Sequence, residues 1–190
     1  MIDPKSLAFD IDGVVADTMT LFIDILKNEF GISDICYEDI TCYNLTECLD
    51  IHADILDETI VKLLDGRHEG TLRPIDGASG VLAHLGKEYG PLVFVTARPY
   101  VGPIEEWMKN LLSLESDDFE IITTGSFDAK AEVLTKKEIS WFVEDRIETC
   151  FMLEKTDKIT PVLFKQPWNR CDHPFVEVGS WTELESLIDF

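Results

Sequence analysis

Short, continuous apolar runs recur along this chain, and amphipathic segments separate them. The runs consist of large apolar and β-branched residues without polar alternation, which is typical of strands buried on both faces. They are Leu7–Phe9, Leu92–Val95, Glu120–Ile122, Trp141–Val143 and Pro161–Phe164. Strands of this kind joined by helices indicate a parallel sheet with helices on both faces. The sequence therefore predicts an α/β fold, a three-layer Rossmann-like parallel sheet.

The helices expected between the strands have their apolar residues at helical spacing. Val81, Leu82 and Leu85 share one face of the first, and Pro103 stands at the start of the second, where proline is favoured. The expected helices are Gly77–Glu88, Pro103–Leu112, Lys130–Lys137, Ile147–Lys155 and Trp181–Ile188.

One long stretch interrupts the alternation. Residues 17–73 have a helical pattern, with apolar residues at helical spacing near both ends of the stretch, and are too many for a single crossover between strands. We expect them to form a small helical cap inserted after the first strand. The predicted domains are an α/β core of residues 1–16 and 74–190 and a cap of residues 17–73.

Composition limits the classes of partner. The 190 residues are 45% hydrophobic and 28% charged, which suits one globular domain with a modest insertion. Acidic residues outnumber basic ones by 37 to 16, so the formal net charge is −21. Such a surface repels nucleic-acid polymers and anionic membranes, and neither is an expected partner. A phosphorylated substrate would need a local cation to bind.

The chain has no feature of a membrane or secreted protein. No apolar stretch approaches the roughly 20 residues of a transmembrane helix, and the first residues lack the layout of a secretory signal. The five cysteines are Cys36, Cys42, Cys48, Cys150 and Cys171, with no C-x-x-C pair. An odd number without such pairs indicates reduced thiols, so we expect a cytoplasmic protein. The sequence does not indicate the oligomeric state or a role for the thiols.

Two carboxylates follow the first expected strand, in the run Asp10-Ile11-Asp12-Gly13. Both can project beyond the carboxyl edge of the sheet, where open parallel sheets bind ligands. Gly13 permits a tight turn there. Paired carboxylates suit a hard cation such as Mg²⁺, although a loop of solvated or capping acids fits this motif alone equally well.

Three further polar stretches follow or lie next to other expected strands. Thr96 ends the second strand, Lys130 opens a helix after the third, and Glu144 and Asp145 end the fourth. Each alone has an ordinary explanation as a helix cap, a solvated lysine or an acidic loop. At one edge of a parallel sheet, however, they would converge with Asp10 and Asp12. Carboxylates for a cation, with a hydroxyl and an ammonium for a phosphate, indicate a phosphoryl-transfer site.

With these motifs in this order, the chain resembles the haloacid dehalogenase-like superfamily, most of whose members are Mg²⁺-dependent phosphohydrolases. The resemblance spans about Leu7 to Phe164. The Thr96-Ala97-Arg98 run, the Glu144-Asp145-Arg146 run and Pro167-Trp168-Asn169 are similar to one branch, the deoxyribonucleotidase-like proteins of the 5′-nucleotidase type C group.

The resemblance implies a role for each motif residue. Asp10 would be the nucleophile that forms an aspartyl-phosphate, and Asp12 would protonate the leaving group and then activate water. The Asp10 carboxylate, the Asp12 main-chain carbonyl and the Asp145 carboxylate would hold Mg²⁺. Thr96 would bind the phosphoryl oxygens, and Lys130 would bind them while holding Asp10 in place.

Two details of the acidic residues follow from their positions. Adjacent strand-end residues point in different directions, so Glu144 and Asp145 are not equivalent ligands. Register with the family favours Asp145 as the direct ligand and Glu144 as an indirect or water-mediated one. Crowding by Asp10 and the leaving group is expected to keep a proton on Asp12 near neutral pH.

Candidate substrate contacts lie beside Thr96 and in the cap. Ala97 and Arg98 follow Thr96, and Arg98 could reach the substrate or brace the acidic loop. Tyr37 and Tyr43 could stack on a base, although packing within the cap explains them at least as well.

The predicted function is a phosphomonoesterase that acts through an aspartyl-phosphate on a small-molecule phosphate monoester. A 5′(3′)-nucleotidase for (deoxy)nucleoside monophosphates fits the branch. A phosphatase for a sugar phosphate or phosphoglycolate remains an alternative within the enzymes. The alternative from another class is a non-catalytic binding protein with the same fold.

Overall fold

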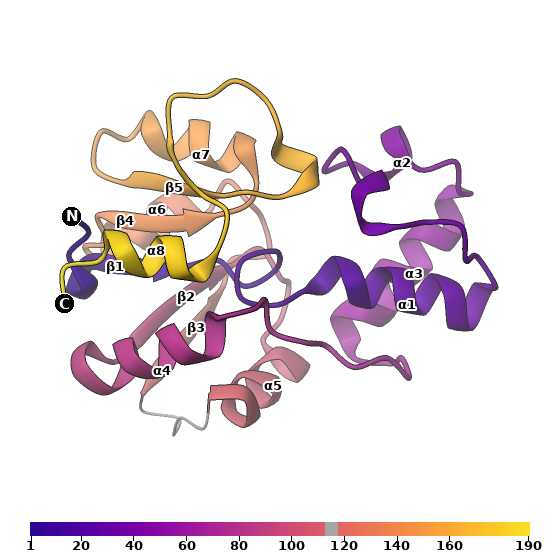
Figure 1. Ribbon diagram of the computed structural model, residues 1–190, viewed down its shortest axis with the longest axis horizontal. Coiled ribbons are helices and arrows are strands. Elements are labelled where there is room, and N and C mark those ends of the chain that lie inside the picture. The colour runs from indigo at the N-terminus through magenta and orange to yellow at the C-terminus, as the bar shows by residue number, and fades with distance from the viewer. Residues whose placement is uncertain (113–117) are drawn as a thin grey trace.

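The computed structural model describes residues 1–112 and 118–190. Its six strands form one parallel sheet in the order β3-β2-β1-β4-β5-β6 (Figure 1). They are β1 Leu7–Phe9, β2 Leu92–Thr96, β3 Phe119–Thr123, β4 Trp141–Glu144, β5 Thr160–Phe164 and β6 Val176–Val178. Five of these are the strands expected from the apolar runs, so the parallel α/β fold is confirmed.

The helices have bounds close to those expected. They are α1 Thr18–Phe30, α2 Leu45–Cys48, α3 Ala53–Asp65, α4 Ala78–Tyr89, α5 Gly102–Leu112, α6 Lys130–Lys136, α7 Ile147–Glu154 and α8 Trp181–Leu187. Short 3₁₀ helices occupy Pro4–Ser6, Tyr37–Asp39 and Pro167–Asn169. In the described part of the chain, no helix is sufficiently long and apolar to cross a bilayer.

Two apolar layers cover the sheet. Helices α4, α5 and α8 bury Leu82, Met108 and Trp181 with Phe9 and Phe94 on one face of it. Helices α6 and α7 pack on the other face. They contribute Leu134 and Leu153 to a cluster that also holds Ala8, Val95 and Phe142. Strands β1 and β2 alternate between the two clusters, which is why their sequences are continuously apolar. The three-layer arrangement is confirmed.

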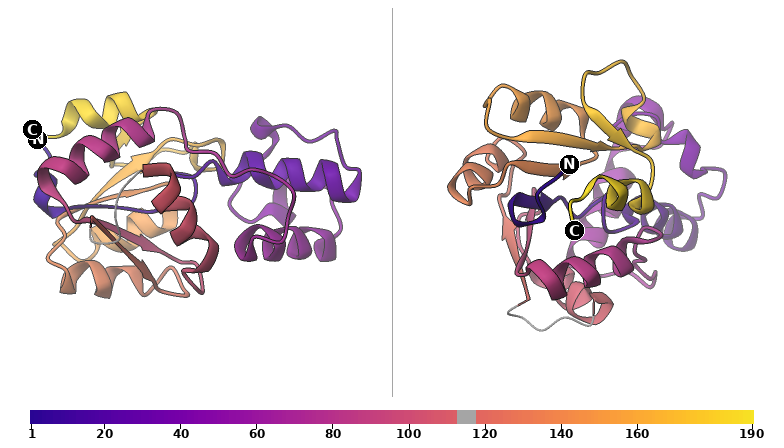
Figure 2. Two further views of the ribbon diagram at one scale, coloured as in Figure 1. Left: turned by 90° about the horizontal axis from the view of Figure 1, so that it is seen from below. Right: turned by 60° about the vertical axis from the view of Figure 1, so that its left-hand side comes forward.

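The helical insertion, residues 17–73, lies beside the carboxyl edge of the sheet (Figure 2). Helices α1 and α3 pack on each other through an apolar cluster of their own, which includes Phe22, Leu26 and Leu56. One residue of this cluster, Trp168, comes from the turn after β5. The division into two domains stays a prediction, but this apolar cluster is distinct from those that cover the sheet.

Strand β6 was not expected from the sequence. It has three residues, of which Val176 and Glu177 are exposed and only Val178 is buried. It pairs with β5 alone, at the edge of the sheet. A short edge strand with one buried side chain has no continuous apolar run, so the pattern that identifies the central strands is absent.

Burial at the centre of the sheet predicts a large difference between two phenylalanines. Phe94 is fully buried on β2, whereas Phe151 on α7 is 37% exposed. We expect Phe94→Ala to lower the free energy of unfolding by about 3–5 kcal/mol, because it leaves a cavity among well-packed side chains. Phe151→Ala is the matched control and should cost less than about 1 kcal/mol. Urea denaturation measures both, and equal losses would contradict this description of the core.

Candidate active site

The polar stretches predicted to converge do so at the carboxyl edge of the sheet. Asp10 follows β1, Thr96 ends β2 and Glu144 ends β4, and these three strands are neighbours. The main-chain N–H of Asp10 donates to the carbonyl of Val143 at 2.9 Å, which continues the pairing of β1 with β4 by one residue. A pocket of about 300 Å³ opens above this edge. On the side of the sheet it is lined by Asp10, Asp12, Thr96, Ala97, Arg98 and Asp145.

Lys130 lies beneath these residues and is completely buried. Its ammonium is 2.8 Å from Asp10 Oδ2 and 2.8 Å from Glu144 Oε2. Burial lowers the pKa of a lysine, but the two carboxylates outweigh burial and hold the pKa of Lys130 above its usual range. The amine is therefore a permanent positive charge that fixes Asp10 against the floor of the pocket.

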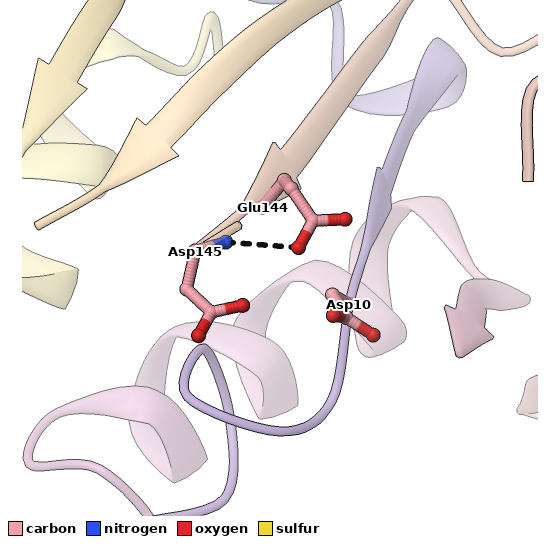
Figure 3. A group of neighbouring side chains, drawn as sticks. All are labelled: Asp10, Glu144 and Asp145. Atoms are coloured by element: carbon pink, nitrogen blue, oxygen red, sulfur yellow. Dashed lines mark hydrogen bonds between the residues drawn. The ribbon is translucent and has the colours of Figure 1, made fainter. Parts of the chain in front are cut away.

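The buried carboxylates lie close together, and their combined charge suits a cation. Oxygens of Asp10, Glu144 and Asp145 lie within 4.8 Å of one another (Figure 3). With Lys130 as their cation, three ionised carboxylates leave two negative charges in excess. Asp10 Oδ1 is buried and has no hydrogen-bond partner. An unpartnered buried oxygen within an excess of negative charge fits a divalent metal ion, because hard cations take carboxylate oxygens as ligands.

Burial and the neighbouring carboxylates shift the pKa values of two of these acids. Burial raises the pKa of Asp10 to about 8, Glu144 and Asp12 act in the same direction, and Lys130 opposes them. Burial, with Glu144 and Asp10 close by, holds the pKa of Asp145 well above its usual range. A metal ion in this cluster would replace protons as the compensating charge.

The two acids that end β4 have different partners. Glu144 Oε1 accepts a bond from the main-chain N–H of Asp145 at 3.2 Å (Figure 3). It also accepts one from the main-chain N–H of Arg146 at 3.0 Å, and Oε2 accepts from Lys130. Both Glu144 oxygens are therefore engaged in holding the loop and the lysine. The Asp145 side chain instead lines the pocket, and Trp168 Nε1 donates to its Oδ2 at 2.8 Å. This geometry favours Asp145 as the direct ligand and leaves Glu144 a supporting role.

The surroundings of Asp12 oppose the expectation that it carries a proton near neutral pH. Arg98 donates to both carboxylate oxygens of Asp12, at 2.8 and 2.7 Å, and Thr18 adds a bond of 2.7 Å. Burial raises the pKa of Asp12, but the guanidinium and these hydrogen bonds outweigh it, and the pKa lies below its usual range. Sequence reasoning considered crowding by Asp10 but did not place Arg98 on this carboxylate. Of its two expected roles, Arg98 here braces the acidic loop.

Thr96 and Ala97 lie where the sequence predicted, in the turn that follows β2. Thr96 is buried, and its hydroxyl oxygen accepts a 3.2 Å bond from the main-chain N–H of Arg98. Its hydroxyl proton can still be donated to an acceptor in the pocket. Thr124, directly after β3, holds this turn, because its N–H and its hydroxyl both donate to the Thr96 carbonyl.

The two tyrosines of the helical insertion have different positions. Tyr43 lines the pocket and meets Phe127 edge-on, with ring centres 5.5 Å apart. Tyr37 is not among the described residues that line this pocket. Its hydroxyl donates to Gln166 Oε1 at 2.9 Å, and its ring lies 5.8 Å from that of Trp168. Of the two, only Tyr43 can touch a ligand here.

Several residues at the pocket were not identified from the sequence. The Arg146 guanidinium lies 4.3 Å from the centre of the Phe127 ring and 5.0 Å from that of Tyr43. Phe127 and Trp168 themselves line the pocket. Trp168 lies in a run that resembles the family, which was the available signal, but neither its contact with Asp145 nor the position of Phe127 follows from spacing along the chain.

Comparison with known proteins gives a consistent family. The model of the family described as "5' nucleotidase, deoxy (Pyrimidine), cytosolic type C protein" matches residues 5–190. A 5'(3')-deoxyribonucleotidase of Bacillus subtilis is 22% identical over 184 residues, 95% of this chain and 96% of that protein.

Solved structures share the fold. A haloacid dehalogenase superfamily hydrolase from Ehrlichia chaffeensis aligns with a TM-score of 0.58 and 16% identity, over 98% of this chain and 97% of that one. A CbbY variant from Rhodobacter sphaeroides, in complex with xylulose-(1,5)bisphosphate, aligns with a TM-score of 0.60 and 16% identity, over 97% and 96%.

The buried ion pairs of Lys130 predict a large cost when its charge is removed. We expect Lys130→Met to lower the free energy of unfolding by about 3–5 kcal/mol, because it strands two buried carboxylates. Lys136→Met is the matched control: its side chain is 72% exposed and pairs with Glu132, so the change should stay within about 0.5 kcal/mol. Urea denaturation of both variants measures the difference, and similar values would exclude a buried charge cluster.

Proposed function

The chain belongs to the cytosolic type C 5' nucleotidase family and is a phosphatase of the haloacid dehalogenase type, and from this we propose that it hydrolyses nucleoside monophosphates with the help of Mg²⁺. The observation that carries the proposal is the pocket itself. Its floor holds Asp10, with an unpartnered buried oxygen, beside Lys130 and Asp145. Residues 1–16 and 74–190 form the catalytic core in this proposal, and residues 17–73 form its cap.

Three groups would hold the Mg²⁺ ion: the Asp10 carboxylate, the Asp145 carboxylate and the main-chain carbonyl of Asp12. The first two fit because their oxygens are close together in a cluster with excess negative charge. When bound, the ion offsets the repulsion between a carboxylate and a phosphate dianion. Glu144 supports this set by fixing Lys130 and the main chain of Asp145.

The reaction proceeds in two displacements at phosphorus. An oxygen of Asp10 attacks the phosphorus, the bond from phosphorus to the ester oxygen breaks, and Asp12 gives a proton to that oxygen. The product is an aspartyl-phosphate, which divides one difficult hydrolysis into two easier steps. Asp12 then takes a proton from water as the water attacks phosphorus, and the Asp10 carboxylate is released with inorganic phosphate.

In this scheme Thr96 binds the phosphoryl group, and Lys130, which is buried beneath the pocket, acts through Asp10. The Thr96 hydroxyl donates to one oxygen, and the Lys130 ammonium lowers the negative potential at Asp10. Arg98 also contributes. Its guanidinium is bound to Asp12 in the absence of substrate, and the oxygens of an incoming phosphate compete for it. This competition loosens the hold on Asp12 and raises the pKa of that carboxyl toward the value that a proton donor needs.

The helical insertion favours an uncharged, apolar leaving group. Its described residues that line the pocket include Ile40, Tyr43, Leu45, Ile60 and Leu63, and none of them is charged. A nucleoside presents a flat base and an uncharged sugar to such a surface. Phosphoglycolate and sugar bisphosphates carry a second anionic group, which finds no cation among the described residues of the insertion that line the pocket. The lining therefore supports a nucleoside over those substrates.

Phosphate release across a panel of monophosphates tests the proposal. The panel contains 5′- and 3′-monophosphates of ribo- and deoxyribonucleosides, a sugar phosphate and phosphoglycolate, each with Mg²⁺. We expect kcat/KM to be at least about 10-fold higher for the nucleoside monophosphates. Burying a base against apolar side chains should stabilise the bound substrate and its transition state by about 1.4 kcal/mol or more. Higher kcat/KM for the sugar phosphate would reject the nucleotidase and keep the phosphatase.

Two controls isolate the chemistry. Asp10→Asn keeps the shape of the side chain but removes the nucleophile, and turnover should fall by at least about 1000-fold. EDTA should abolish release, and added Mg²⁺ should restore it. Normal turnover by Asp10→Asn or full activity in EDTA would refute the proposed site. No release from any substrate would favour a binding protein with this fold.

A further inference from the structure

The turn of residues 166–169, which follows β5, touches three parts of the molecule at once. Figure 1 shows this segment leaving the sheet and reaching the helical insertion. The turn is closed on itself, because Asn169 Oδ1 accepts a 2.9 Å bond from the N–H of Gln166. Gln166, Trp168 and Asn169 are all buried. It contacts the loop that holds Asp145, the loop that follows Asp10 and the helical insertion.

Asn169 fixes the turn to the Asp145 loop. Its side-chain amide donates to the Asp145 carbonyl at 2.7 Å and to the Phe164 carbonyl at 2.8 Å. These bonds join the ends of the neighbouring strands β4 and β5. The main chain of Asp145 and the base of the turn are therefore tied to each other.

Trp168 reaches the carboxylate itself. Its indole N–H donates to Asp145 Oδ2 at 2.8 Å. Packing leaves both groups little freedom, because a Cβ at Gly13 would overlap the Asp145 carboxylate and lie 3.1 Å from Cζ2 of Trp168. Gly13 has a φ of +74° and no side chain, and this lets the indole and the carboxylate meet above its loop.

The Trp168 side chain also packs against the helical insertion. Trp168 is 8% exposed and packs in the apolar cluster of α1 and α3, although it follows β5 and lies outside the insertion in sequence. Tyr37 of the insertion holds the same turn, through its hydroxyl bond to Gln166 Oε1. Gln166 Nε2 in turn donates to the Gly13 carbonyl at 2.7 Å. Trp168 therefore contacts both the apolar cluster of the insertion and the Asp145 carboxylate.

We propose that Trp168 is a positioning residue that couples seating of the helical insertion to orientation of the Asp145 carboxylate for a divalent cation. The inference rests on the proposed function, which takes Asp145 as a metal ligand. An indole is suited to this task because it is a neutral donor. It fixes one carboxylate oxygen without cancelling the charge that attracts the cation, whereas Arg98 neutralises Asp12. Partners of this kind orient ligands, and their loss weakens metal binding.

The test compares metal binding by the free protein, without substrate or turnover. Mn²⁺ is the probe, and its unbound fraction is measured by electron paramagnetic resonance. In Trp168→Phe an aromatic ring remains in the apolar cluster, but the donor is lost. We expect the dissociation constant for Mn²⁺ to rise about 10- to 100-fold. Thermal unfolding of the same samples in EDTA reports whether the variant is folded.

Trp107→Phe is the matched control. Trp107 also donates its indole N–H to a protein oxygen, the Leu72 carbonyl of the insertion at 2.9 Å, but this bond touches neither the turn of residues 166–169 nor the carboxylate cluster. Its loss should leave the dissociation constant for Mn²⁺ unchanged. Equal weakening in the two variants would mean that any lost indole bond has this effect, and it would overturn the assignment.

Tyr37→Phe tests the coupling to the insertion. This variant loses only the hydroxyl bond to Gln166, which touches no proposed ligand. We expect weaker Mn²⁺ binding than in the wild type, and Tyr37→Phe with Trp168→Phe should bind no more weakly than Trp168→Phe alone, because both act along one path. Additive losses, or an unchanged Tyr37→Phe, would overturn the coupling.

The outcomes for this inference and for the proposed function are distinct. If wild-type protein binds no Mn²⁺ at millimolar concentrations, the metal site of the proposed function fails. If the wild type binds and Trp168→Phe binds equally well, only the role of Trp168 is overturned.

Discussion

Burial of the Lys130 ammonium between Asp10 and Glu144 is the interaction on which the arrangement of the site depends. Its geometry comes from the sheet, because neighbouring parallel strands β1 and β4 end side by side and α6 begins beneath them. A buried ion pair is costly to form and more costly to break. Asp145 adds a further carboxylate to the cluster, so negative charge remains in excess. The fold thus leaves an excess of negative charge at the floor of the pocket, where a cation would be stabilised.

The two carboxylates of the Asp10-Ile11-Asp12-Gly13 run meet opposite environments although only one residue separates them. Burial raises the pKa of Asp10 to about 8, despite Lys130. Asp12, held by Arg98 and Thr18, has its pKa lowered despite the same burial. The proposed roles need the opposite assignment, because Asp10 attacks as a carboxylate and Asp12 gives up a proton. In the proposed function, a cation beside Asp10 and a phosphate that draws Arg98 away from Asp12 would reverse the two shifts.

The pocket has two unlike sides, and different parts of the chain supply them. The sheet contributes charged and hydroxyl groups, whereas the helical insertion contributes Tyr43 and aliphatic side chains. Under the proposed function, the sheet side of the pocket carries out the chemistry and the insertion side selects the leaving group. Trp168 lies at their junction, packed in the apolar cluster of the insertion and hydrogen-bonded to Asp145. A change in the insertion can reach the carboxylate cluster through this one residue.

The sequence by itself determined the parallel sheet and the convergence of Asp10, Thr96, Lys130 and Asp145, because residues at the ends of buried parallel strands must meet at one edge. Tertiary structure decided which partner each group took. The Arg98–Asp12 pair joins residues 86 apart, and the bond from Trp168 to Asp145 spans 23. No local period encodes such contacts. They arise from how loops and the helical insertion pack above the sheet. The edge strand β6 was not predicted for the same reason, because its pairing with β5 defines it and no apolar run marks it.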